Sequence, residues 1–190
     1  GANGLIGREV ADALSSAGSN LMLLDVASDD SLKIYAKRLS EKYSTKTKSY
    51  CANIADVGQI GDVIDKIASD FGKIDVLINL AAIDAKFDVD LDNMPKTAFE
   101  DFPMDLWKKS IDVNVTGTFN ITQQVIKKML EQGFGNIINV ASTYSLVSPN
   151  QNLYKFDEES EQLFKPVDYV VTKSVIPNFT RYLATFYGKK

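Results

Sequence analysis

Two side chains in the C-terminal part of the chain, Tyr169 and Lys173, have the types and the spacing needed to move a proton. They lie four residues apart in a predicted helix, so both side chains face the same way. A lysine ammonium near a phenol stabilises the phenolate, and Tyr169 could then give a proton to a substrate oxygen or take one from it. Ser142 ends an apolar run and could hydrogen-bond the same oxygen. Each residue alone fits a packing role equally well, so this interpretation depends on their occurring together.

The composition narrows the chemistry further. The 190 residues include no histidine and a single cysteine, which argues against a zinc site and a His-based triad. We therefore expect no metal ion and assign catalysis to carboxylates, hydroxyls, amines or a bound cofactor. The net charge of −4 gives no basic surface for nucleic acid, and no apolar run reaches the ~18–20 residues that cross a bilayer. These features argue against a nucleic-acid or a membrane partner. We expect a cytoplasmic protein with a small-molecule substrate.

A glycine pattern opens the chain, with Gly1, Gly4 and Gly7 spaced as GxxGxxG. Glycines in a tight turn let the backbone approach a pyrophosphate, and the N-terminus of the following helix offers N–H groups to the anion. A glycine-rich turn without a ligand is the alternative, because the pattern alone is weak evidence. If a dinucleotide binds, we expect the contacts to come from Gly1, Asn3, Gly4, Leu5 and Ile6.

Asp25 lies 18 residues after Gly7, at the end of an apolar run. An acidic residue at about this distance can accept hydrogen bonds from the adenosine ribose hydroxyls, and its charge repels a 2′-phosphate. The position therefore favours NAD over NADP. The alternative is a solvated aspartate at the end of a strand.

Apolar runs alternate with amphipathic stretches along the whole chain. The runs predict strands at 20–26, 48–52, 74–81 and 136–141. The stretches predict helices at 5–17, from a start at 28–30 to about 43, at 56–71, at about 104–131 and at 167–187. Uniformly apolar strands separated by helices are typical of an α/β fold, a doubly wound parallel sheet with helices on both faces. The length indicates one domain over 1–190. Because the chain opens inside the glycine pattern and stops just after a helix, we expect this domain to be incomplete at both ends.

Several segments together resemble the short-chain dehydrogenase/reductase family. They are Tyr169-x-x-x-Lys173, the strand that ends at Ser142, the helical segment around Asn114, the Asn79–Ala82 segment and the Asn53-Ile54 pair. They occur in the family's order and cover nearly the whole chain. The resemblance implies a Rossmann-type three-layer sandwich and an NAD(P)-dependent oxidoreductase that transfers a hydride between nicotinamide and an alcohol or carbonyl group.

The resemblance also implies roles for individual residues. Tyr169 would be the acid/base, Ser142 would hold the substrate oxygen, and Lys173 would also bind the nicotinamide ribose. Asn114 would hold a water that links Lys173 to solvent. Asn53 and Ile54 would flank the adenine, and Asn79 and Ala81 would lie beside the cofactor. The helices at 104–131 and 167–187 resemble the pair through which family members assemble, so we expect a homodimer or homotetramer.

Two spacings depart from the compact branch of the family and resemble its extended branch. Two residues, rather than three, separate the first two glycines, and Tyr169 lies 27 positions after Ser142. The resulting insert at 143–166 is placed to line the substrate site, where Tyr144 and Tyr154 could stack on a sugar; a solvated surface excursion is the alternative. The insert also resembles a subgroup linked to bacterial polysaccharide and flagellin-glycan biosynthesis, which suggests a sugar or sugar-derived substrate. Two alternative functions are a nucleotide-sugar epimerase with retained NAD and a non-catalytic dinucleotide-binding protein.

Overall fold

The computed structural model describes residues 1–27, 30–84, 98–155 and 162–189. The chain divides into two compact units. Unit 1 contains residues 1–81 and 117–138, and unit 2 contains residues 82–116 and 139–189. Each unit is described by itself below.

Unit 1 is built from alternating helices and strands. They are α1 (Leu5–Ser16), β1 (Leu21–Asp25), α2 (Asp30–Tyr43), β2 (Thr47–Cys51), α3 (Val57–Phe71), β3 (Val76–Asn79), α5 (Thr118–Gln132) and β4 (Asn136–Asn139), whose last residue belongs to unit 2. β1 and β2 pair in parallel, from Leu21 opposite Thr47 to Asp25 opposite Cys51. β3 pairs with β4 in a second two-stranded sheet.

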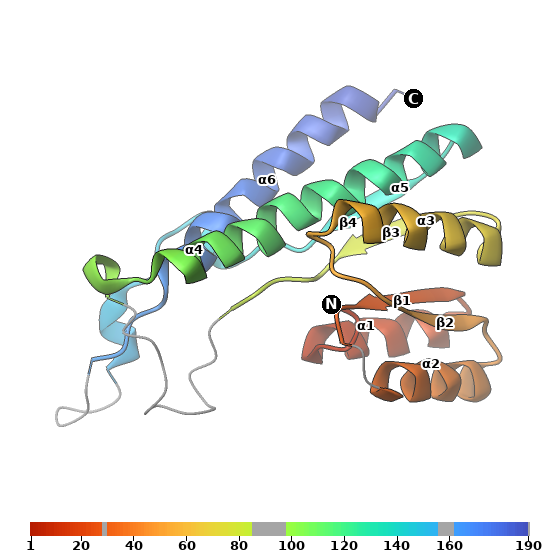
Figure 1. Cartoon of the computed structure of the whole chain (residues 1–190), viewed down its shortest axis with the longest axis horizontal. Helices are drawn as coiled ribbons and strands as arrows, with labels where there is room; N and C mark the ends of the chain where they lie inside the picture. Colours follow the sequence, from red (N-terminus) through yellow and green to blue (C-terminus); the bar gives the residue numbers. More distant parts are fainter. Residues whose placement is uncertain (28–29, 85–97, 156–161, 190) are drawn as a thin grey trace. The chain divides into compact units, whose positions relative to one another are not determined.

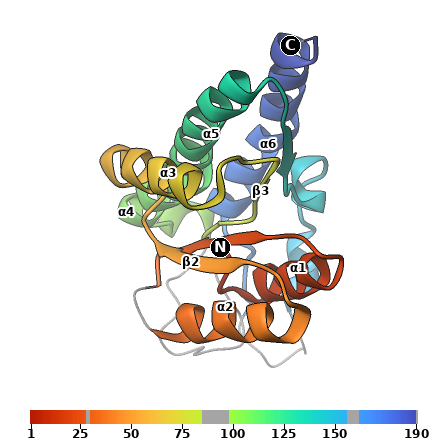
Figure 2. The same cartoon turned by 90° about the vertical axis from the view of Figure 1, so that its right-hand side faces the viewer.

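Helices α1 and α2 cover one face of the β1–β2 pair (Figures 1 and 2). The core beneath them is apolar and includes Leu23, Leu32 and Leu39, of which Leu39 is fully buried. α3 packs against α5. Its ends follow ordinary capping rules, because Asp56 accepts a hydrogen bond from the Gln59 N–H at 3.0 Å and Gly72 adopts a left-handed conformation with φ of 80°.

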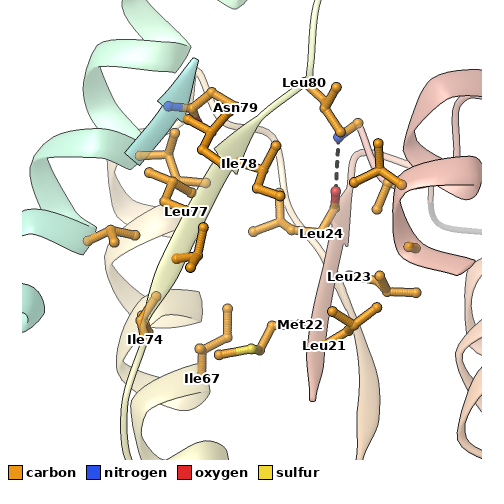
Figure 3. A pocket seen from close by; sticks show the side chains of 18 of the residues that line it. Leu21, Met22, Leu23, Leu24, Ile67, Ile74, Leu77, Ile78, Asn79 and Leu80 are labelled. Carbon is orange, nitrogen blue, oxygen red and sulfur yellow. Dashed lines mark hydrogen bonds between the residues drawn. The ribbon is translucent and has the colours of Figure 1, made fainter. Parts of the chain in front are cut away.

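A cavity of about 550 Å³ lies within unit 1, between the edge of β1 that does not face β2 and the strand β3 (Figure 3). Most of its wall is apolar, with Leu21 to Leu24 on one side and Leu77 and Ile78 on the other. Gly1 and Ala2 close one end, where the Ala2 N–H donates to the Leu24 carbonyl at 3.1 Å. A space with a mostly apolar wall does not suit a charged dinucleotide.

Unit 2 is mainly helical. Its elements are η2 (Phe99–Asp101), α4 (Met104–Ser110), the π-helical segment η3 (Ile111–Gly117, ending in unit 1), η4 (Thr143–Ser145), η5 (Gln151–Tyr154) and α6 (Val167–Tyr187). α4 packs on α6, where the Ser110 hydroxyl donates to the buried Asp168 carboxylate. η4 packs on α6 as well.

The predicted elements are largely confirmed. The strand expected at 74–81 is shorter, Val76–Asn79. The backbone of Ile74, before this strand, is bound by the Gln132 side chain, whose Oε1 accepts from Ile74 N–H at 3.2 Å. The helix expected at 104–131 contains the π-helical segment, and the insert contains two short 3₁₀ turns. None of the helices in the described ranges is long and apolar enough to span a membrane.

Candidate active site

The glycine loop is packed so tightly that two of its glycines have no room for a side chain. A Cβ on Gly7 would come 2.2 Å from the Gly1 carbonyl oxygen, and a Cβ on Gly1 would come 2.7 Å from the Ala81 nitrogen. Gly4 is the N-cap of α1, and no side chain caps that helix in residues 1–27. The first-turn N–H groups of α1 therefore have no side-chain acceptor, and an anion could bind them.

Polar contacts fix the conformation of this loop. The Arg8 guanidinium donates to the Asn3 side-chain oxygen at 2.6 Å and to the Asn3 carbonyl at 3.2 Å. Arg8 also lies 4.8 Å from the Tyr35 ring centroid, in a cation–π contact. The side chains of Leu5 and Ile6, by contrast, are 85% and 60% exposed. Arg8 was missed at the sequence level, because an arginine in a first helical turn is ordinary.

Asp25 lies at the end of β1 and contacts the glycine loop. Its carboxylate accepts hydrogen bonds from Asn3 N–H at 2.9 Å and from Ala27 N–H at 3.0 Å. Burial would raise the pKa of Asp25, but these two N–H groups and the Gly1 amino group outweigh it and hold the pKa below the usual value. Asp25 therefore carries a negative charge beside the loop, as the discrimination against a 2′-phosphate requires.

The other predicted cofactor residues of unit 1 have different environments. Asn53 is exposed and accepts a hydrogen bond from Ala55 N–H at 3.0 Å. Ile54 is 7% exposed and packs where Gly117 leaves room for it. Asn79 ends β3 and donates to the Thr122 hydroxyl at 2.9 Å, and the backbone of Ala81 lies against Gly1. Gly1, Asn3, Asp25 and Ala81 thus share one region, whereas the Ile54 side chain is largely enclosed by protein.

In unit 2, Tyr169 and Lys173 lie on successive turns of α6, as the spacing predicts. The Lys173 ammonium is buried, donates to the Val140 carbonyl at 2.7 Å and lies 6.0 Å from the Tyr169 ring centroid. Burial lowers the pKa of Lys173, and the Asp84 carboxylate partly opposes this shift. The tyrosine ring is half-buried, so it remains accessible.

Ser142 is connected to the same helix. It is the N-cap of η4, where its hydroxyl accepts from Tyr144 N–H at 3.2 Å and its own N–H donates to the Ser145 hydroxyl at 3.0 Å. The Ser145 hydroxyl in turn donates to the Lys173 carbonyl at 2.7 Å. The turn that carries Ser142 is therefore attached to α6 at the residue that the catalytic interpretation requires.

Asn114 lies in the π-helical segment and is 2% exposed. Its amide brackets Ile83, accepting from Ile83 N–H at 2.7 Å and donating to the Ile83 carbonyl at 3.0 Å. It also donates to the Thr172 hydroxyl at 3.0 Å, next to Lys173 in sequence. Local π-helical turns are frequent at functional sites, and this one directs a buried amide towards α6.

The insert contributes a pair of tyrosines and a buried lysine. The hydroxyls of Tyr144 and Tyr154 lie 2.5 Å apart, and burial followed by this hydrogen bond raises the pKa of Tyr154 to about 12. Lys165 is 7% exposed, forms an ion pair with Asp84 at 2.5 Å and lies 4.3 Å from the Tyr169 ring centroid. The sequence did not indicate Lys165 or Asp84, because 81 residues separate them.

The structure thus assembles the predicted residues within each unit. Unit 1 brings the glycine loop, Asp25 and Ala81 together, and unit 2 brings Tyr169, Lys173 and the turn of Ser142 together. No group of three His, Cys, Asp or Glu side chains gathers as metal ligands among the residues that the structure describes.

Comparison with known proteins identifies the family. The model of the short chain dehydrogenase family matches residues 1–155. D-beta-hydroxybutyrate dehydrogenase of Rhizobium meliloti is 29% identical over 150 residues, which are 78% of this chain and 54% of the relative. 3-oxoacyl-(acyl-carrier-protein) reductase of Thermotoga maritima is 33% identical over 155 residues, 81% of this chain and 58% of the relative.

Among solved structures, NAD+-bound xylitol dehydrogenase matches with a TM-score of 0.78 and 26% identity, covering 97% of this chain and 61% of that one. The chain therefore spans a little over half the length of the curated relatives it matches. The family match covers most of the chain and ends inside the insert, before Tyr169. The Rossmann-type fold and its glycine loop agree with this match, and the chain belongs to the short-chain dehydrogenase/reductase family.

Proposed function

We propose that the protein is an NAD-dependent oxidoreductase that interconverts an alcohol and a carbonyl compound, with Ser142, Tyr169 and Lys173 as its catalytic residues. One observation carries the proposal: the turn of Ser142 is hydrogen-bonded through Ser145 to the backbone of Lys173, one helical turn after Tyr169. A phenol and an ammonium on one helix, with a serine hydroxyl on the turn that is bound to that helix, provide a proton donor, a cation and a hydrogen-bond donor.

The chemistry of these side chains follows from their environments. Ser142 donates a hydrogen bond to the substrate oxygen and fixes it for proton transfer. Tyr169 gives its proton to that oxygen during reduction and takes one back during oxidation. The Lys173 ammonium stabilises the phenolate electrostatically, and its hydrogen bond to the Val140 carbonyl fixes its position. Asn114 supports this arrangement through Thr172 and Ile83.

The residues of unit 1 fit a nicotinamide dinucleotide, which supplies or accepts the hydride when bound. Backbone atoms lie so close to Gly1 and Gly7 that a Cβ at either position would collide with them. The N-cap of α1 is Gly4, which has no side chain to cap the first turn. This cradle would hold the pyrophosphate, and the exposed Leu5 and Ile6 would contact the cofactor. Asp25 would bind the adenosine ribose hydroxyls, which supports NAD over NADP.

The proposed substrate is a small polyhydroxylated compound, a sugar or sugar-derived alcohol or ketone. The paired hydroxyls of Tyr144 and Tyr154 support it, because a fixed pair of amphipathic rings suits a sugar face. A structural relative named xylitol dehydrogenase is consistent with this class.

We further propose a role in bacterial polysaccharide or flagellin-glycan biosynthesis. We also propose assembly into a homodimer or homotetramer through α5 and α6, where Phe119, Tyr182 and Phe186 are exposed.

A nucleotide-sugar epimerase that retains its NAD is the second candidate. The 27-residue step from Ser142 to Tyr169 favours it, since this spacing resembles the extended branch of the family. The two candidates differ in cofactor exchange: an epimerase purifies with bound NAD and yields no net NADH, whereas an oxidoreductase exchanges cofactor and accumulates NADH.

The test is a substrate panel measured by NADH absorbance. The panel contains xylitol, gluconate, D-3-hydroxybutyrate, free hexoses and UDP-linked sugars, each with NAD and with NADP. We expect turnover with at least one polyol or sugar and NAD, and we expect Tyr169→Phe to lose nearly all of it while its NAD affinity stays within about twofold. Tyr187→Phe, at the C-terminal end of the same helix, is the matched control, and we expect it to keep its activity. A largely active Tyr169→Phe variant would refute the assignment.

A further inference from the structure

A second buried lysine contacts the ring of the proposed catalytic tyrosine. Lys165 is 7% exposed, and its ammonium lies 4.3 Å from the Tyr169 ring centroid, compared with 6.0 Å for Lys173. A cation within ~6 Å of an aromatic centroid is attracted by the ring, and more strongly when water is excluded from the contact. Of the two lysines, Lys165 is the one closer to the ring.

Hydrogen bonds within the insert fix the backbone of Lys165. The Gln151 side chain, in η5, accepts from Lys165 N–H at 2.9 Å and donates to the Lys165 carbonyl at 3.3 Å. The Gln162 side chain donates to the Gln151 carbonyl at 3.0 Å. The Gln151 side chain therefore clamps the backbone of Lys165, four residues before Tyr169, and Gln162 in turn bonds the backbone of Gln151.

Asp84 forms an ion pair with the Lys165 ammonium. The Asp84 carboxylate oxygen lies 2.5 Å from the Lys165 nitrogen, and the Asp84 side chain is partly exposed. Asn114 holds the segment before it, because its amide brackets the backbone of Ile83. A buried lysine is costly unless paired and hydrogen-bonded, so a contact network from Asn114 through Asp84 to Lys165 indicates a maintained position rather than an incidental one.

We propose that Lys165 is a positioning residue for Tyr169: the insert and Asp84 hold its ammonium against the phenol ring, where it fixes the ring and favours its phenolate. The inference rests on the proposed function, because it assigns the insert a task in the same proton transfer. The Asp84 carboxylate neutralises part of the positive field of the Lys165 ammonium. Lys165 therefore stabilises the Tyr169 phenolate less than an unpaired cation at the same distance would. Lys173 and Lys165 then act on one ring from separate elements.

The experiment compares Lys165→Met, which keeps the aliphatic stem but removes the charge, with Lys165→Arg, which keeps the charge. Lys155→Met is the matched control, since Lys155 is an exposed lysine of the same insert. The first readout is the pH dependence of kcat for alcohol oxidation, with the alcohol that the substrate panel identifies. The second needs no substrate: the ¹³C chemical shift of the Tyr169 ring, with tyrosine labelled at Cζ and assigned by Tyr169→Phe.

Loss of the cation makes the phenolate harder to form. In Lys165→Met we expect the half-maximal pH of both readouts to rise by about one unit, a tenfold change in the ionisation equilibrium. Lys165→Arg stays within about 0.3 unit of the parent, and Lys155→Met does not differ from it. If circular dichroism shows that Lys165→Met is unfolded, Lys165→Gln, which retains a donor for Asp84, is measured in the same way.

The outcomes separate this inference from the proposed function. An unchanged half-maximal pH in Lys165→Met or Lys165→Gln overturns the inference, even where Tyr169→Phe is inactive as proposed. A shift in Lys165→Arg as large as that in Lys165→Met also overturns it, since the lysine would then act through packing rather than charge. An active Tyr169→Phe variant overturns the proposed function instead, and the NMR titration still decides whether Lys165 acts on the ring.

Discussion

Replacing Gly7 by alanine should weaken dinucleotide binding at least tenfold. The added Cβ would lie 2.2 Å from the Gly1 carbonyl oxygen and 2.9 Å from the Ala2 Cα, and both are backbone atoms that cannot rotate away. Since ordinary contacts begin near 3.4 Å, the loop and α1 must separate by about 1 Å in an otherwise close-packed region. Overpacking of this kind costs about 1–3 kcal/mol of folding stability.

The same displacement moves the N–H groups that would bind the pyrophosphate. Loss of one hydrogen bond to a charged group corresponds to about 1.5–3 kcal/mol, or roughly 10- to 100-fold in the dissociation constant. The assays are calorimetric titration with NAD and urea unfolding of the same samples. We expect the urea midpoint to fall and NAD affinity to drop at least tenfold.

Another glycine, Gly61 inside α3, serves as the control. A Cβ on Gly61 meets nothing within 4 Å, so Gly61→Ala should raise the free energy of unfolding by about 0.5–1 kcal/mol and leave NAD binding unchanged. If Gly7→Ala bound NAD as tightly as Gly61→Ala, the loop would not be the pyrophosphate site.

Asp25, Lys173 and the cavity of unit 1 each allow a separate test. Asp25→Asn keeps an acceptor for the loop but removes the charge, so the ratio of NADP to NAD affinity in calorimetric titrations should rise about tenfold; an unchanged ratio would contradict the role of Asp25. Burial lowers the pKa of Lys173, so the unfolded chain binds more protons, and the free energy of unfolding should rise with pH between that lowered pKa and 10.5. Urea unfolding at pH 7 and 10 should show this rise in the parent and a smaller one in Lys173→Met. Fusing a six-residue apolar β-strand before Gly1 should fill the cavity beside β1 and raise the urea midpoint, whereas the same extension with a central proline should not.

Much of the fold could be predicted because its elements are strongly patterned. Uniformly apolar runs such as Leu21–Leu24 leave few alternatives to a buried strand, and glycines such as Gly72 mark helix ends by their left-handed conformation. The π-helical segment at Ile111–Gly117 could not be predicted, since it differs from an α-helix by one hydrogen-bond step and leaves the apolar pattern intact.

Some residues of the candidate site could be predicted from short sequence patterns, and others could not. Tyr169 and Lys173 could be found because a four-residue spacing on a helix is a local signal. Lys165 and Asp84 could not, because no local pattern connects residues that meet only in the folded chain. A solvated surface excursion was the alternative for the insert, but the Gln151 side chain makes defined contacts with the Lys165 backbone in its described part.

Isotope transfer tests most directly whether Tyr169 supports hydride transfer to a carbonyl compound. The protein is incubated with NADH deuterated at C4 and the carbonyl compounds of the substrate panel, and the products are examined by mass spectrometry. We expect an alcohol that carries one deuterium with the parent protein and none above background with Tyr169→Phe. A parent protein that binds NADH but transfers no deuterium to any member of the panel, or equal transfer by Tyr169→Phe, would contradict the proposed hydride transfer.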